Sequence, residues 1–233
     1  MAIWDDLVAY YKCADGSDSW GEYEVSLTDV ELSEGIGPTF SSWDFAASGS
    51  SDKAVVLETN AIPANTGILS VSMWFKGLRT GNGSAFTSGS PTSNNTIIRI
   101  ASDELGIRVG TVTSCGYNVT PIRGLSTWTH LAVTADGAGN YEFYIDGSNV
   151  GSISAGPVFV NDVKRIGNLN GSDDEFADYI TEIAFWSRVL TTDEVELIYS
   201  NGASGTRDLT RLVPYTRKQL PDDQSNGWFN MSG

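Results

Sequence analysis

The sequence predicts an all-β fold: a two-sheet antiparallel sandwich, followed by one short helix and an extended tail. The pattern of apolar and polar residues is the first reason. About ten short runs with period-two alternation lie between residues 7 and 190, separated by clusters of Gly, Asn, Asp, Ser and Pro. The composition agrees, because 25 glycines with seven Trp, nine Tyr and nine Phe suit short strands joined by tight turns.

The runs also predict which side chains form the core. Side chains alternate across a strand, so Val71 and Phe75 share one face of their run while Trp74 and Lys76 share the other. The same parity places Trp128 and His130 opposite the apolar row of their strand, and the predicted core is Val71, Phe75, Leu131, Val133, Phe143 and Ile183. The runs expected to form strands are 7–12, 43–46, 53–58, 69–76, 96–101, 106–112, 128–135, 141–145, 163–166 and 178–186.

Local signals predict one hairpin and one helix. Asp146-Gly147 supplies the two residues tolerant of positive φ that a type I′ turn requires. Thr191 and Glu194 form a capping box for a helix over 192–199, which Asn201-Gly202 is expected to end. This is the short helix after the last strand.

The chain divides into a sandwich (residues 1–202) and a C-terminal arm (residues 203–233). The arm carries four basic and three acidic residues, whereas the sandwich carries ten basic and 26 acidic residues. Alternation is absent from the arm, and we expect it to be ordered only against a partner or a neighbouring subunit. The residues expected to anchor it in an assembly are Arg207, Arg211, Leu212, Tyr215, Arg217, Trp228 and Phe229.

Charge and hydropathy exclude several classes of partner. The formal net charge of −15 repels a polyanion over most of the surface, so we expect no nucleic acid to bind. No apolar stretch is long enough to cross a membrane, and the N-terminus shows no secretory signal. Cys13 and Cys115 are too few for a disulfide framework, and the sequence leaves open whether they pair.

Three blocks carry a family resemblance: LVAYY (7–11), WTHLAVT (128–134) followed by YEFYIDG (141–147), and YITEIAFWSRVLTTDEV (179–195). Their order and spacing resemble laminin-G-like domains of the concanavalin A-like lectin/glucanase superfamily. The resemblance implies a jelly-roll sandwich that works as a binding or structural module. Family members commonly carry Asp before Glu in the closing strand, and Thr181 precedes Glu182 here, which weakens the implied case for a structural calcium ion.

Motifs for catalysis are absent, so we expect no enzyme. Sandwich-fold glucanases place their carboxylates as Glu-x-Asp-x-x-Glu, which does not occur in this sequence. A Gly-x-Ser-x-Gly elbow is absent too, and the sole histidine, His130, lies in a predicted strand, which favours a structural role. One histidine and two separated cysteines do not favour a zinc site. We expect no cofactor, with calcium as the one open case.

Two groups of residues are candidate binding sites, each with a plainer alternative. A calcium ion would take oxygen ligands from an acidic loop that could equally be solvated: Asp173, Asp174, Glu175 and Asp178. A sugar would use aromatic rings and a rim loop whose residues could equally be core and turn: Trp74, Tyr144, Trp186, Asn94 and Asn95. The sequence does not identify the sugar.

The leading hypothesis is a non-catalytic structural or adhesion module on a larger assembly. A virion decoration or fibre protein of a bacterial virus, made in the host cytoplasm, fits an unfused domain that begins at Met1 without an export signal and ends in an anchoring arm. Its partners would be other copies of itself, a capsid or tail protein, and cell-surface glycans. The alternative is a free carbohydrate-binding lectin.

Overall fold

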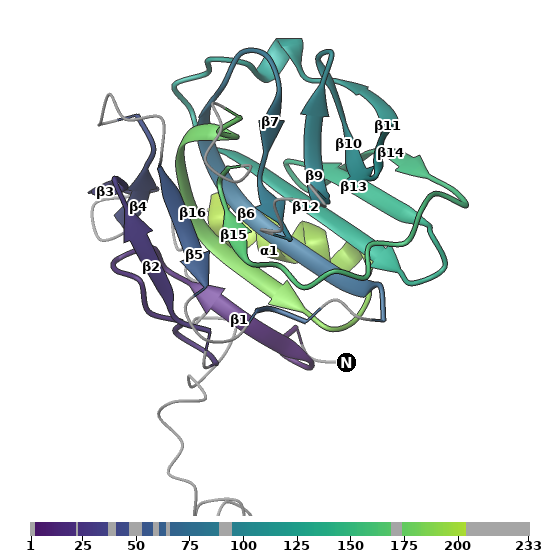
Figure 1. The fold of residues 1–233 in the computed structure, drawn as a ribbon, viewed down its shortest axis with the longest axis horizontal. Coiled ribbons are helices and arrows are strands. Elements are labelled where there is room, and N and C mark those ends of the chain that lie inside the picture. The colour runs from purple at the N-terminus through teal and green to yellow at the C-terminus, as the bar shows by residue number, and fades with distance from the viewer. Residues whose placement is uncertain are drawn as a thin grey trace, which may run out of the picture.

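The computed structural model describes residues 3–21, 23–36, 41–46, 53–57, 61–63, 66–88, 95–168 and 174–203. Two antiparallel sheets of eight strands each pack face to face, and one helix lies against the outside of one sheet (Figure 1). The prediction of an all-β antiparallel sandwich with one short C-terminal helix is confirmed.

The sheet that carries the helix is called sheet A. Its long central strands, β6 (Ile68–Leu78) and β16 (Ala177–Trp186), pair with each other. The spatial order is β14 (Ser148–Ile153), β13 (Tyr141–Ile145), β12 (Thr129–Asp136), β6 (Ile68–Leu78), β16 (Ala177–Trp186), β4 (Ser41–Asp44) and β3 (Glu31–Glu34), and β1 (Leu7–Tyr11) also pairs with β16.

The opposite sheet is called sheet B. A short 3₁₀ helix at Thr120–Ile122 follows its edge strand β11 (Thr111–Asn118) and begins the connection to β12 of sheet A. The spatial order is β11 (Thr111–Asn118), β10 (Glu104–Val109), β9 (Thr96–Ala101), β8 (Phe86–Thr87), β15 (Arg165–Ile166), β5 (Ala54–Leu57) and β2 (Val25–Thr28), and β7 (Gly83–Ser84) pairs with β9.

The main core lies between the two sheets. All six residues predicted for it are at most 1% exposed, which confirms the alternation argument: Val71, Phe75, Leu131, Val133, Phe143 and Ile183. Aromatic contacts connect the layers, as where the rings of Phe86 in sheet B and Phe185 in sheet A meet edge to face at 5.0 Å. The hairpin prediction also holds, since Asp146 and Gly147 both have positive φ between β13 and β14.

The helix α1 (Thr192–Ala203) covers part of the outer face of sheet A (Figure 1). The capping box is present, because Glu194 N–H donates to Thr191 Oγ1 at 3.3 Å and Thr191 N–H donates to Glu194 Oε2 at 2.8 Å. The helix runs through Asn201-Gly202 to Ala203, so the expected end at residue 199 is wrong by one turn. No helix in the described part of the chain is long and apolar enough to cross a membrane.

The sequence pattern did not predict every strand. Strands β2, β3 and β11 have largely exposed or half-buried residues, so their sequences lack a clear apolar row. The run 106–112 spans two strands, because Gly110 has a φ of +71° and turns the chain between β10 and β11. Cys13 is buried and Cys115 is half-buried, and both are free thiols.

The arm residues all lie outside the described part of the chain, except Ala203 in α1. This applies to every residue proposed to anchor the chain in an assembly: Arg207, Arg211, Leu212, Tyr215, Arg217, Trp228 and Phe229.

Candidate ligand-binding site

A row of side chains crosses the outer face of sheet A beyond the part that α1 covers. Tyr179 on β16 pairs directly with Lys76 on β6 and with Asp44 on β4. Trp128 directly precedes Thr129, which pairs with Phe75, so continuing this register by one residue brings Trp128 opposite Lys76. Residues opposite each other in an antiparallel pair present their side chains on the same face. These four residues are called the aromatic row.

The ammonium group of Lys76 lies between the two rings of the row. Its Nζ is 4.2 Å from the ring centroid of Tyr179 and 5.1 Å from that of Trp128. Both distances are within the range of cation–π attraction, which holds the rings in position. All three side chains are half-buried, so each keeps surface that a ligand can reach.

Two carboxylates affect the phenol of Tyr179. The charge of Asp44, then burial, then the charge of Asp178 raise the pKa of Tyr179 above its usual value. A negative neighbour disfavours the phenolate, so the hydroxyl keeps its proton at every physiological pH. Tyr179 can therefore both donate and accept a hydrogen bond in the row.

Asp178, the residue before Tyr179 on β16, forms an ion pair with Arg79. Arg79 Nε is 2.7 Å from Asp178 Oδ1, and Arg79 Nη2 donates to the carbonyl of Phe45 at 3.1 Å. The close approach depends on Gly77, whose φ is +70° and whose missing Cβ would lie 2.4 Å from Asp178 Oδ2. A larger residue at position 77 would displace the carboxylate from this place.

The chemical groups in the row are better suited to binding a sugar than to catalysing a reaction. Ring surface can bury the apolar C–H face of a pyranose or furanose, and charged groups make strong hydrogen bonds to hydroxyls. Lys76 donates, and the hydroxyl of Tyr179 both donates and accepts. Asp44 is only 8% exposed and its Oδ1 already accepts from Ala46 N–H at 2.7 Å, so it acts on a ligand mainly through its charge. Asp178 is engaged by Arg79, and the paired-carboxylate glucanase motif is missing from the sequence.

The three aromatic residues predicted to contact sugar lie elsewhere, in the interior. Trp74, Tyr144 and Trp186 are 4%, 3% and 1% exposed. The ring of Trp74 stacks on Tyr199 of α1 at 5.8 Å, and Tyr144 Oη lies 3.3 Å from Thr192 Oγ1. Tyr144 and Trp186 belong to a second apolar cluster between α1 and sheet A, and Trp74 packs on Tyr199 of the same helix. None of the three rings therefore presents an open face to a ligand. The prediction that these rings bind sugar is corrected accordingly.

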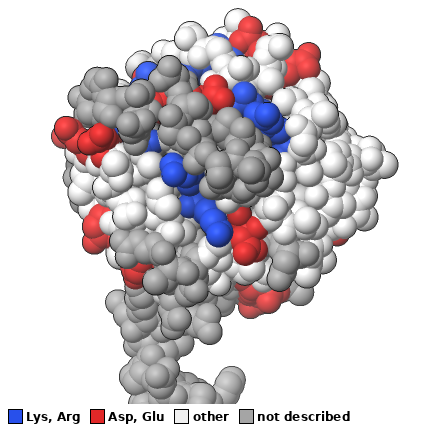
Figure 2. Space-filling view, viewed as in Figure 1, with Lys and Arg blue, Asp and Glu red and all other residues white. Residues whose placement is uncertain are grey.

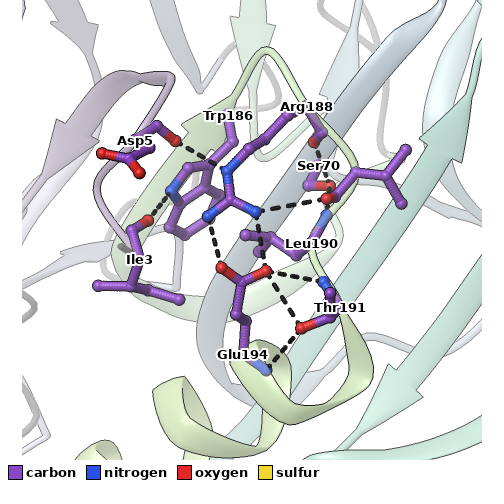
Figure 3. A network of polar contacts seen from close by, with 9 residues as sticks. Ile3, Asp5, Ser70, Trp186, Arg188, Leu190, Thr191 and Glu194 are labelled. Atoms are coloured by element: carbon purple, nitrogen blue, oxygen red, sulfur yellow. Dashed lines mark hydrogen bonds and ion pairs between the residues drawn. The ribbon is translucent and has the colours of Figure 1, made fainter. Parts of the chain in front are cut away.

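A polar network fixes α1 over this cluster (Figure 3). Arg188 makes two bonds to Glu194, at 2.7 and 2.8 Å, and its Nε donates to the carbonyl of Asp5 at 2.8 Å. The hydroxyl of Ser70 on β6 donates to the Arg188 carbonyl, and Trp186 Nε1 donates to the carbonyl of Ile3. The hydrogen bonds from Arg188 hold the pKa of Glu194 below its usual value. The network explains why this half of the face is closed.

The predicted rim loop is on the other sheet. Asn95, next to β9, donates from Nδ2 to Asn161 Oδ1 at 2.6 Å and accepts from Gly110 N–H at 2.9 Å. Asn94 lies outside the described residues. The structure therefore does not bring Asn95 together with the three predicted aromatic residues.

The predicted calcium ligands do not converge on one point, because two of them pair with different arginines. Asp174 Oδ2 lies 3.0 Å from Arg99 Nη1, whereas Asp178 pairs with Arg79. Glu175 is 7% exposed, and Asp173 lies outside the described residues. Among the residues that the structure describes, no group of three or more His, Cys, Asp or Glu side chains could hold a metal ion.

Sequence reasoning missed the aromatic row, although part of its signal was present. The parity of their strands placed Lys76 and Trp128 on the face opposite the core. Nothing in the sequence showed that Tyr179 and Asp44 would join them, because that depends on the pairing of β16 with β6 and β4.

Residues 48–196 match the family model described as the concanavalin A-like lectin/glucanases superfamily. The chain belongs to this superfamily. The resemblance inferred from the three sequence blocks is thereby confirmed at the level of the family. None of the curated proteins compared with the chain matches it.

Solved structures with the same fold include binding domains. Domain 4 of AbnA, a GH43 extracellular arabinanase from Geobacillus stearothermophilus, in complex with arabinotriose, is 22% identical with a TM-score of 0.63, and the match covers 82% of this chain and 97% of that one. The binding domain of botulinum neurotoxin DC in complex with SialylT is 16% identical with a TM-score of 0.61, and the match covers 85% of this chain and 51% of that one. The serotype G binding domain is 14% identical with a TM-score of 0.62, with 85% and 51% covered.

Proposed function

We propose that this chain is a non-catalytic carbohydrate-binding module whose ligand lies on the aromatic row. The observation that carries the proposal is the position of Lys76 between the half-buried rings of Trp128 and Tyr179, on the part of sheet A that α1 leaves uncovered. Rings held in place before binding lose little conformational entropy when a ligand arrives.

Two further observations support a binding role over a catalytic one. The fold neighbours include a domain solved in complex with arabinotriose and a toxin binding domain solved in complex with SialylT. The superfamily also contains glucanases, but this sequence lacks their Glu-x-Asp-x-x-Glu motif. We therefore expect hydrolysis assays on polysaccharides to show no product.

The test is a glycan array followed by titration calorimetry of the best ligand. Trp128→Ala should weaken binding by more than about tenfold, which is about 1.4 kcal/mol, because it removes a main contact surface. Tyr117→Ala is the matched control, since Tyr117 is a half-buried aromatic residue on the edge strand β11 of sheet B. Equal affinity of Trp128→Ala and the parent chain would contradict the proposal.

A structural role on a larger assembly is the second candidate. The observation behind it is the composition of the C-terminal arm, which combines basic residues with Trp228, Phe229 and Tyr215 in a chain that is otherwise strongly acidic. Docking of this arm on a capsid or tail protein would place the sandwich on a virion surface. Electron microscopy of particles from the native source, with the chain labelled, tests this: labels at repeated positions are expected, and label absent from purified particles would refute it.

A further inference from the structure

A second row of side chains crosses the outer face of sheet B. Arg165 on β15 pairs with Thr87 on β8, Thr87 pairs with Thr96 on β9, and Thr96 pairs with Arg108 on β10. The four side chains therefore point to one face, the face turned away from the core. Three strand spacings separate the two arginines, so their Cα atoms are about 14 Å apart. This set is called the arginine row.

These two arginines differ from the others in the described part of the chain. Arg79, Arg99, Arg123 and Arg188 each pair with a carboxylate, at distances of 2.6 to 3.0 Å. Arg108 and Arg165 are half-buried, and neither forms an ion pair with any residue that the structure describes. In a chain with 29 acidic and 14 basic residues, two such arginines in one row are unexpected.

The surroundings of the row are polar. Between the arginines lie Thr87 and Thr96, which are 1% and 0% exposed and whose hydroxyls bond to backbone carbonyls. Only the two arginines at the ends of the row therefore reach the surface, and the Asn95–Asn161 amide pair is next to the same strands. Viewed from the side of sheet B, several basic side chains lie at the margins of the central region that is drawn in grey, and most acidic ones lie farther out (Figure 2). None of the four residues of the row is one of the large aromatic residues that typically anchor a protein partner.

We infer that the arginine row binds the acidic groups of a glycan, either carboxylates or sulfates. A guanidinium group offers a planar pair of N–H donors that matches a carboxylate or sulfate, and the two donors stand at the spacing of separate acidic groups along an extended sugar chain. A densely charged polyanion would be repelled by the net charge of −15, whereas isolated acidic groups reach the arginines at short range, where distant charges are screened. This surface is independent of the aromatic row, which lies on the opposite sheet.

The experiment is titration calorimetry of the full chain with two oligosaccharides of equal length. The first is a hyaluronan oligosaccharide, which has a carboxylate on every second sugar, and the second is a neutral chito-oligosaccharide. The double variant Arg108→Gln/Arg165→Gln should bind the acidic sugar at least tenfold more weakly, and raising the salt concentration should weaken binding to the parent chain. The matched control, Lys12→Gln/Arg123→Gln, removes the same charge elsewhere and should keep the affinity. Thermal unfolding of each variant checks that it is folded.

Each outcome decides the inference. It is overturned if the parent chain does not prefer the acidic sugar, or if the control loses as much affinity as the double variant. It is also overturned if Arg108→Gln/Arg165→Gln abolishes self-association and leaves acidic-sugar binding unchanged, because the partner would then be the acidic surface of another copy. Trp128→Ala separates the two sites: it should weaken binding at the aromatic row and leave the arginine row unaffected.

Discussion

The outer face of sheet A has two halves built from the same strands. One half is buried under α1, and the other remains partly exposed. On β6, Trp74 and Lys76 are two residues apart on one face, and Trp128 and His130 stand in the same relation at the start of β12. Trp74 and His130 are buried under α1, whereas Lys76 and Trp128 keep part of their surface exposed. Alternation thus determines the face on which a side chain lies, and a later element determines whether that face is open.

The largest difference between the halves should be seen in stability. Trp74→Ala removes a ring that packs on His130 and Tyr199, and should lower the free energy of unfolding by about 3–5 kcal/mol. Trp128→Ala, in the open half, should cost less than about 1.5 kcal/mol, because its ring is already partly in water. Urea unfolding of both variants measures this. Equal losses would mean that the two halves do not differ in packing.

Acid should act on the covered half through His130. Burial lowers the pKa of its imidazole from 6.5 to about 3, and Nε2 bonds to Ser72 Oγ at 2.8 Å. The unfolded chain binds the proton more readily, so the stability from this residue is complete above pH 6.5 and is lost as the pH falls toward 3. At pH 5 the loss is about 2 kcal/mol.

Urea unfolding between pH 7.5 and pH 5 checks the size of this effect, with the His130→Gln variant as reference. The variant removes only the histidine contribution and keeps that of the carboxylates. If the parent chain and His130→Gln lose stability in parallel over this range, the imidazole of His130 is not the group responsible.

The cap of α1 should contribute a smaller amount. Thr191→Ala removes the hydroxyl that accepts the Glu194 N–H, and should cost about 1 kcal/mol. Because the cap stabilises the covered half only, sugar affinity at the aromatic row should stay within about twofold of the parent value. Calorimetric unfolding and ligand titration on the same preparation measure both effects. A large loss of affinity would show that α1 also supports the open half.

Removing the arm should have the smallest effect on the sandwich. Deletion of residues 204–233 should leave the thermal unfolding midpoint nearly unchanged, because the sequence of this segment lacks the apolar alternation of a packed element. The same deletion should abolish any attachment to an assembly. A truncated chain that no longer folds would place the arm in the core of the domain, and one that still assembles would remove its role as an anchor.

The sequence by itself determined the fold class, the core and the start of the helix, because these depend on local patterns. Alternation alone identified Leu131 and Phe143 as core residues, and a four-residue motif at Thr191 located the start of α1. It also placed Trp128 and Lys76 on the outward face. The same reasoning failed at Trp74 and Trp186, which share that face and are nevertheless buried.

Only the tertiary structure decided which outward residues meet and which remain open. Lys76, Tyr179 and Asp44 come from three strands and Trp128 from the residue before a fourth, so strand order and register bring them together. Strand order and register likewise place Arg108 and Arg165 in one row of sheet B. The position of α1, held by Arg188 and Glu194, then closes one half of sheet A. Contacts between residues more than a hundred positions apart depend on the packing of the whole chain, so a local sequence pattern cannot predict them.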